Sequence, residues 1–116
     1  MTKETLLNVA KLKDSDYVIE NGRIEDTKFG IEDHGVLTLD IIIEGEGWGC
    51  SFGNYNMHSL KGIDCLMEIL QTLDVRNYEE IKGQNVRVMF DKGDKTVAFG
   101  HLMKDRWFSF KQFFGT

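Results

Sequence analysis

The residues best suited to chemistry in this sequence form a short basic and aromatic segment, Lys104-Asp105-Arg106-Trp107-Phe108. An arginine beside a tryptophan offers a flat guanidinium group and a ring face, which together can grip a nucleotide base and its phosphate. Arg87 and Lys82 are further candidates for a phosphate contact. The plainer alternative is that Asp105 pairs with Arg106 as a solvated surface ion pair. The segment predicts either an anion-binding site or an ordinary charged loop.

The charge of the chain is divided unevenly along its length. Residues 1–81 contain 7 Lys/Arg and 16 Asp/Glu, a net charge of −9, and residues 82–116 contain 7 Lys/Arg and 3 Asp, a net charge of +4. The overall charge of −5 disfavours nonspecific binding to nucleic acid or to an anionic membrane, because both require a basic surface. An anionic ligand is therefore expected in the basic last third. Aromatic rings are also concentrated there, and most of them are expected in the core.

The common metal-binding and phosphate-loop motifs do not occur in the sequence, since it holds no HExxH, CxxC or P-loop pattern. No two of His34, His58 and His101 stand four residues apart, so a zinc site would need ligands from separate strands, such as Cys50 or Asp105. We therefore expect a protein that is not an enzyme and that carries no metal or cofactor.

Two β-hairpins are predicted to form the frame that positions these residues. Residues 23–29 and 36–44 alternate in polarity around a turn that ends at Gly35, and residues 85–91 and 96–103 do the same around a second turn. Between the hairpins, residues 45–56 are predicted to form a strand with one face lined by glycines. Those glycines are Gly45, Gly47, Gly49 and Gly53. Such a face allows close approach by another backbone, a ring or a ligand.

One main helix and one short helix are predicted to pack on this sheet. The main helix begins at Ser59 and carries an apolar stripe at helical spacing. The stripe consists of Ile63, Leu66, Met67, Leu70 and Leu73. The short helix follows an Asn77-x-x-Glu80 capping box and ends before Gly83. Residues 107–114 close the chain, either as a last strand or as an amphipathic turn over the core.

A length of 116 residues fits a single α+β domain, mainly an antiparallel β-sheet with these two helices packed on it. Residues 1–22 are weakly patterned and are expected to form an extended arm or edge strands before a core of residues 23–114. No apolar stretch is long enough for a membrane span or a secretory signal, so a cytoplasmic location is expected. Cys50 and Cys65 are expected to be buried free thiols.

Three blocks of the sequence together resemble a family of small phage and prophage proteins. The blocks are FGIEDHGVLTLDIIIEGEGWGCSFGNY, CLMEILQTLDVRNYEEIKGQNVRV and AFGHLMKDRWFSFKQFF. They match an EDHG-type hairpin, a GxGWGxxFGxY strand and a closing KDxWF segment, and they span roughly residues 23–114. The family resembled is the Thoeris anti-defence family, which acts as a sponge for cyclic ADP-ribose signals.

The resemblance implies that the chain acts in the host cytoplasm and sequesters glycocyclic ADP-ribose, or another cyclic oligonucleotide, without cleaving it. It also implies a homo-oligomer, a dimer or an assembly of dimers, with sites near subunit boundaries. The base would lie between the ring of Tyr78 and the guanidinium of Arg106, an arrangement suited to a purine. Asn54 and Arg87 would contact the ribose and phosphates, and Trp107 would add a further ligand contact.

Two other classes of function fit the sequence. An acidic protein-binding inhibitor, such as an anti-CRISPR, could use the charge of −9 on residues 1–81 to mimic nucleic acid against a basic partner. A small structural or assembly protein of a phage would need no ligand at all. Both classes stay open at the level of the sequence.

Overall fold

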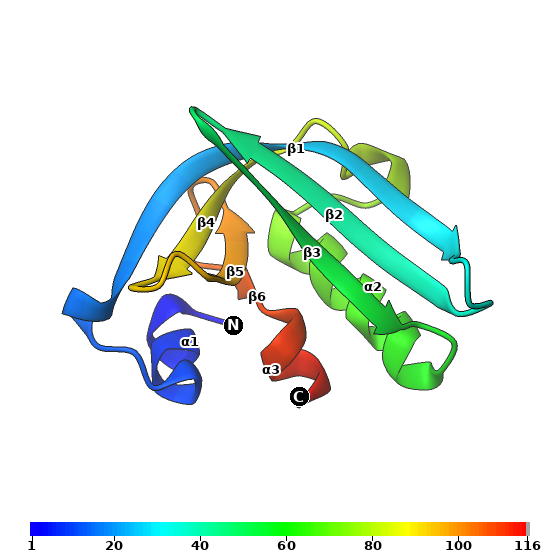
Figure 1. The fold of residues 1–116 in the computed structure, drawn as a ribbon, viewed down its shortest axis with the longest axis horizontal. Helices are drawn as coiled ribbons and strands as arrows, with labels where there is room; N and C mark the ends of the chain where they lie inside the picture. Colours follow the sequence, from blue (N-terminus) through cyan, green and yellow to red (C-terminus); the bar gives the residue numbers. More distant parts are fainter. Residues whose placement is uncertain (116) are drawn as a thin grey trace.

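The computed structural model describes residues 1–115, which form a six-stranded antiparallel sheet in the order β3-β2-β1-β4-β5-β6 (Figure 1). The strands are β1 Tyr17–Ile31, β2 Leu37–Gly45, β3 Trp48–Asn56, β4 Asn85–Asp91, β5 Thr96–His101 and β6 Trp107–Phe108. The helices are α1 Lys3–Ala10, α2 Leu60–Leu73 and α3 Phe110–Phe114, with short 3-10 helices η1 Asp14–Asp16 and η2 Tyr78–Glu80. The predicted α+β class is confirmed.

Strand β1 is 15 residues long and joins the two halves of the sheet. Its first half pairs with β4, from Tyr17 opposite Asp91 to Arg23 opposite Asn85. Its second half pairs with β2, and that ladder begins only at Arg23. Residues 17–22 are therefore an integral part of the sheet and not a loose arm, although within residues 1–115 they have a strand partner on one side only.

The core consists of two clusters on opposite faces of the sheet. Trp107 and Phe108 are neighbours in β6 and belong to different clusters, and neighbouring strand residues point to opposite faces. The larger cluster includes Phe108 and lies between the sheet, α2 and α3. The smaller cluster consists of Leu6, Met89, Ala98 and Trp107. Helix α1 therefore covers the face of β4, β5 and β6 that α2 leaves free.

The expectation of an extended N-terminal arm is wrong, because residues 3–10 form α1. The Thr2 hydroxyl accepts a hydrogen bond from the Thr5 N–H at 3.2 Å and caps the helix. Leu6 is fully buried against the sheet. Because Leu6 is the only buried residue of α1, the segment shows little of the apolar periodicity that predicts a helix. Packing against the sheet therefore stabilises the helical conformation of residues 3–10.

The expectation of one glycine-lined strand over residues 45–56 is also wrong, because the segment contains the turn between β2 and β3. Gly47 has a φ of 79°, which favours glycine at the turn. The Trp48 ring packs directly on Gly45, where a Cβ would overlap it. At Gly22 of β1 a Cβ would lie 2.8 Å from the same ring. Close approach by a ring is therefore the reason for glycine at Gly45 and Gly22.

Helix α2 forms as predicted, but its predicted stripe faces the core only in part, since Leu73 is buried and Leu66 and Leu70 pack against the core. Ile63 and Met67 are 67% and 57% exposed. The buried residues of the helix are Gly62, Cys65, Ile69, Thr72 and Leu73. Gly62 lies so close to the Met57 backbone that no side chain fits between them. Gly62 thus lets the start of the helix approach the segment after β3, and the helix buries Ile69 and Leu73.

Other local predictions are confirmed. Residues 85–91 and 96–101 form the second hairpin as β4 and β5. The Glu80 carboxylate accepts a hydrogen bond from the Asn77 N–H at 3.1 Å. Residues 107–114 combine both expected forms, a short strand followed by α3. No helix among residues 1–115 is both long and apolar enough to cross a membrane.

Both cysteines are free, with Cys65 buried and Cys50 partly buried. Burial raises the pKa of the Cys50 thiol to about 11 and that of Cys65 to about 12. Because the thiolate is the reactive form of cysteine, both side chains are poor nucleophiles near neutral pH.

Replacing Gly62 by alanine tests the close approach of α2. Alanine favours a helix by about 1 kcal/mol over glycine, so an uncrowded site would become more stable. Here we expect Gly62→Ala to lower the free energy of unfolding by about 1–3 kcal/mol, because the methyl group meets the Met57 backbone. Urea denaturation measures the change. Gly30→Ala is the control, since nothing lies within 4 Å of that Cβ position, and an equal loss there would contradict the steric explanation.

Candidate functional site

Arg106 lies in the loop between β5 and β6, against the C-terminal end of α2. Its Nη1 donates a hydrogen bond to the Gln71 carbonyl at 3.1 Å and lies 3.7 Å from Asp74 Oδ1. Lys104 Nζ donates to the other carboxylate oxygen of Asp74. The bond from Lys104, with smaller contributions from the nearby cations, lowers the pKa of Asp74. One carboxylate therefore holds two cationic side chains on this loop.

The expected pairing of Arg106 with Asp105 does not form. Asp105 Oδ1 instead accepts a hydrogen bond from the Lys3 N–H at 2.7 Å, at the start of α1. A carboxylate at the first turn of a helix is favoured by the free N–H groups there. Asp105 thus ties the loop to α1, and Asp74 is the acidic partner of Arg106.

Arg87 holds the same loop from β4. Its Nε donates to the His101 carbonyl at 2.9 Å, and its Nη2 donates to the Lys104 carbonyl at 2.9 Å. The guanidinium carbon lies 4.8 Å from the centre of the Trp107 ring, within cation–π range. Arg87 is therefore placed to position the loop that carries Arg106.

Trp107 is part of the core, with 1% of its surface exposed. Its Nε1 is buried without a hydrogen-bond partner among the described residues. The Met1 ammonium group donates to the Trp107 carbonyl at 2.9 Å, and the Trp107 N–H donates to the Met1 carbonyl at 2.7 Å. Because the Trp107 ring is buried, it offers no exposed face for the predicted contact with a ligand.

Tyr78 lies in η2, next to the second half of β1. Its hydroxyl is 3.0 Å from the Thr27 hydroxyl, which donates to the Asp40 carbonyl at 3.0 Å. Thr27 has one proton to give, so the Tyr78 O–H is the donor of the pair. The Tyr78 ring centre is 6.0 Å from that of Phe29. Tyr78 contacts Thr27 and Phe29, whereas Arg106 contacts Gln71 and Asp74. Within residues 1–115 the two side chains share no contact.

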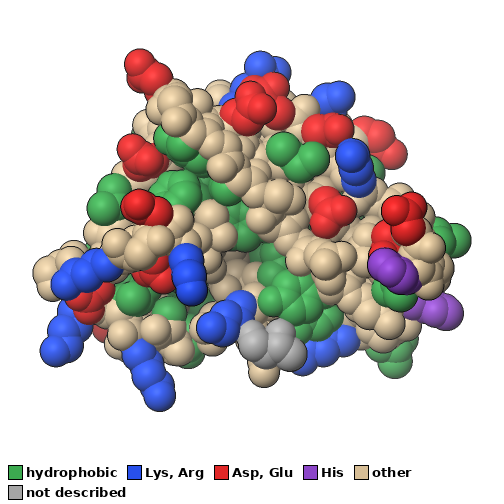
Figure 2. Space-filling model, in the orientation of Figure 1, with side chains coloured by type: hydrophobic (Ala, Val, Ile, Leu, Met, Phe, Trp, Pro, Cys, Tyr) green, Lys and Arg blue, Asp and Glu red, His purple; other side chains and the backbone are tan. Residues whose placement is uncertain are grey.

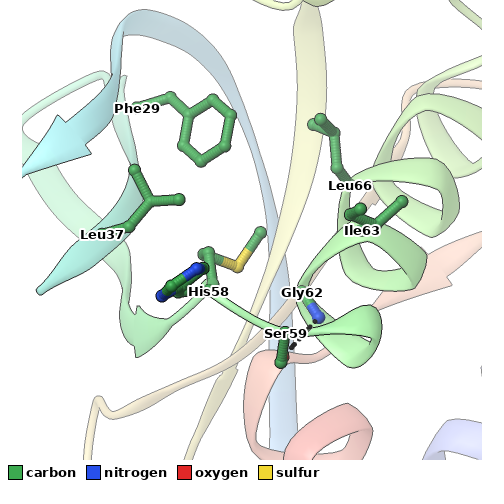
Figure 3. Close-up of a pocket in the computed structure, with 8 residues that line it drawn as sticks. Phe29, Leu37, His58, Ser59, Gly62, Ile63 and Leu66 are labelled. Atoms are coloured by element: carbon green, nitrogen blue, oxygen red, sulfur yellow. Dashed lines mark hydrogen bonds between the residues drawn. The ribbon is translucent and has the colours of Figure 1, made fainter.

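Beyond Phe29 lies an apolar groove of about 460 Å³, between the β1–β2 hairpin and the first half of α2. Figure 3 shows Phe29 and Leu37 on one side of it and Ile63 and Leu66 on the other, with His58 between them. Ser59 Oγ accepts a hydrogen bond from the Gly62 N–H at 3.0 Å and begins the helix at the groove. The groove offers mainly apolar surface, and sequence reasoning missed it because Ile63 was assigned to the core.

Asn54 lies on β3, away from the strand that carries Arg87. It is exposed on β3 with a φ of 67°, next to Gly53 with a φ of 130°, where the pairing with β2 shifts register. Two strands, β2 and β1, lie between β3 and β4. The structure thus brings Arg87, Trp107 and Arg106 together and leaves Tyr78 and Asn54 apart from them.

His101 is a further member of the Arg106 loop that the sequence did not assign. Its Nδ1 accepts hydrogen bonds from the Met103 N–H at 3.0 Å and the Lys104 N–H at 2.9 Å. Burial lowers the pKa of His101, and Lys104, Arg106 and Arg87 act in the same direction, whereas Asp74 opposes them. The folded structure therefore favours the neutral form of His101. Among residues 1–115, no group of three or more potential ligands could hold a metal ion.

Residues 49–53, Gly-Cys-Ser-Phe-Gly, form a GxSxG pattern that the prediction from sequence did not include. In hydrolases this motif occupies a sharp turn from a strand into a helix. Here all five residues lie within β3, and Ser51 is exposed opposite Ile42 of β2. Cys50 and Phe52 pack toward the core on either side of it. The pattern reflects the alternation of a strand and does not form a nucleophile turn.

Comparison with known proteins adds no family. No family model matches the chain, and no curated protein or solved structure matches it. The resemblance to the phage anti-defence family therefore stays a prediction.

Acidification should loosen the Arg106 loop through His101. Because the folded protein holds the pKa of His101 below its ordinary value, the unfolded chain takes up this proton first as pH falls. We expect the contribution of neutral His101 to the free energy of unfolding to be complete above about pH 6.5 and to be lost as the pH falls below it. Urea denaturation across this range measures the loss. His101→Asn keeps an acceptor that does not titrate and should flatten the profile, whereas His34→Asn at an exposed turn should keep it.

Proposed function

We propose that this chain is a non-catalytic binding protein that sequesters a cyclic nucleotide. The observation that carries the proposal is the gathering of Arg87, Lys104 and Arg106 around one loop. Asp74 pairs with two of these cations, so the group keeps an excess of positive charge for a phosphate. This concentration agrees with the net charge of +4 on residues 82–116.

Arg106 is the best-placed residue for direct contact with the base or phosphate. Its side chain is 46% exposed and borders a hollow of about 330 Å³. Its Nη1 donates one hydrogen bond to the Gln71 carbonyl and forms an ion pair with Asp74, and we propose that a base stacks on a flat face of the guanidinium. Arg87 supports the site by holding the loop, and Lys104 adds charge.

Tyr78 would complete the site from a second copy of the chain. Among residues 1–115 Tyr78 contacts Thr27 and Phe29 and does not contact Arg106, so we propose that the base lies between Tyr78 of one copy and Arg106 of another. Around Phe29, beside Tyr78, several large apolar side chains are exposed on the hairpin and on α2. These are Ile31, Leu60, Ile63 and Met67. Exposed apolar surface of this kind is typical of a protein–protein interface, and we propose that this face forms a homo-oligomer.

The proposed mechanism is reversible sequestration, in which the ligand is held and not cleaved. Charge-assisted contacts to phosphate and stacking on the base supply affinity without any covalent step. Heating the complex should therefore release the ligand intact. Recovery of a cleaved product in amounts exceeding the protein would contradict this mechanism.

Arg106→Ala should weaken binding of glycocyclic ADP-ribose by about tenfold to several hundredfold, because it removes a charged contact and a stacking plane. Isothermal titration calorimetry measures the affinity of both proteins. Arg76→Ala removes an equal charge from an exposed position outside this loop and should bind like the unmodified chain. Equal affinities for unmodified protein and Arg106→Ala would remove Arg106 from the site.

Light scattering tests the proposed interface. The unmodified chain should have at least twice the monomer mass of 13.3 kDa at micromolar concentration. Ile63→Asp places a charge on the apolar face and should shift the protein toward the monomer, because a buried unpaired charge is costly. Val9→Asp, at an exposed apolar position on α1, should leave the mass unchanged. A monomeric unmodified chain would contradict the interface and the two-copy site.

A further inference from the structure

An aromatic hollow of about 510 Å³ lies where the first half of β1 and the end of β4 meet the start of β3, and it shares no lining residue with the apolar groove or with the hollow beside Arg106. Trp48 and Phe90 form its walls, with ring centres 5.1 Å apart in an edge-to-face arrangement. Val18 of β1 lines it and is 58% exposed. Figure 2 shows hydrophobic side chains between the β2–β3 turn and β4, with acidic side chains on the surface around them. Neither ring belongs to the site proposed above.

The charges around this hollow are negative and lack ion-pair partners. Glu20 and Asp94 line it, and Glu46 lines a second hollow of about 390 Å³ on the other side of Trp48. None of these three carboxylates forms an ion pair among residues 1–115. Aromatic faces and carboxylates together attract an ammonium or guanidinium group, through cation–π attraction and charge. The hollow therefore suits a cationic side chain and disfavours an anionic nucleotide.

The backbone beside the hollow is an open strand edge. Residues 17–22 of β1 pair with β4 on one side, and the ladder to β2 on the other side begins at Arg23. Their remaining N–H and C=O groups can pair with an added strand, a common mode of peptide recognition. Side chains of such a strand would alternate, so that one of them reaches the hollow beside Val18 and Glu20.

We infer that a basic, extended segment of a partner protein binds along the edge of β1 at residues 17–22. One arginine or lysine of that segment enters the hollow beside the Trp48 and Phe90 rings, where Glu20 and Asp94 provide the opposite charge. The backbone ladder supplies position, and the cationic side chain supplies selectivity. A second copy of this chain fits the edge less well, because like charges would meet there.

The probe is a short, capped peptide that alternates arginine and threonine, titrated into isotopically labelled protein and followed by NMR. Amide signals of residues 17–22 and the Trp48 indole signal should shift together, and those amides should exchange more slowly with solvent. The same peptide with citrulline in place of arginine keeps the shape and loses the charge. We expect it to bind at least about threefold more weakly, the scale of a partly exposed cation–π and ion-pair contact.

Matched variants separate the two parts of the inference. Glu20→Gln and Asp94→Asn should each weaken binding of the arginine peptide about two- to fivefold without unfolding the protein, because both side chains are exposed. Glu79→Gln removes a carboxylate from η2 and should have no effect. Arg106→Ala should also have no effect, so failure here and failure of nucleotide binding are distinguishable.

Three results would overturn the inference. Equal binding of the arginine and citrulline peptides would remove the cation site, and shifts confined to other residues would remove the edge. Self-association through residues 17–22 that increases in Glu20→Gln would mean that the carboxylates only protect the edge from other copies.

Discussion

The hydrogen-bond ladder of β1 is the interaction on which the rest of the structure depends. One strand pairs with β4 through its first half and with β2 through its second half, so it links the arm that carries Arg87 to the arm that forms the apolar groove. A register shift between Ile24 and Asp26 falls just beyond the change of partner. Such irregularities bend a strand, and here the shift falls close to the boundary between the half of β1 that pairs with β4 and the half that pairs with β2.

Short local networks of hydrogen bonds hold the charged side chains of the Arg106 loop in place. On the Arg106 loop the carbonyls of His101 and Lys104 accept from Arg87, and the neutral imidazole of His101 accepts from the backbone of the same turn. The loop thus satisfies its polar groups without regular secondary structure. Around Trp48 the opposite charge prevails, because carboxylates border the rings without cationic partners. Cationic side chains thus gather on the Arg106 loop, and carboxylates without ion-pair partners among residues 1–115 gather around Trp48.

Much of the fold could be predicted from the sequence, because hairpins, caps and α2 depend on local patterns. The helical state of residues 3–10 could not, since it depends on burial of Leu6 by distant strands. The burial of Trp107 beside Arg87 depends on register, since Arg87 and Trp107 both pair with Gly100. The orientation of α2 could be predicted only in part, since Gly62 lies against the Met57 backbone while Ile63 and Met67 of the predicted stripe are exposed. Side chains far apart in sequence therefore form a site that residue type alone cannot locate.

The irregular backbone at Gly53 and Asn54 has a consequence for association between sheets. Strand β3 is one outer edge of the sheet, and positive φ angles at both residues interrupt its ladder. Strand β6, at the other edge, is only 2 residues long. Neither of these two outer strands offers a long, flat template for another strand, which is one way natural β proteins avoid stacking into fibrils. The open stretch of β1 at residues 17–22 is the remaining edge, and Glu20 places a negative charge on it. Crowded copies can thus meet through side chains while their outer strands stay unjoined.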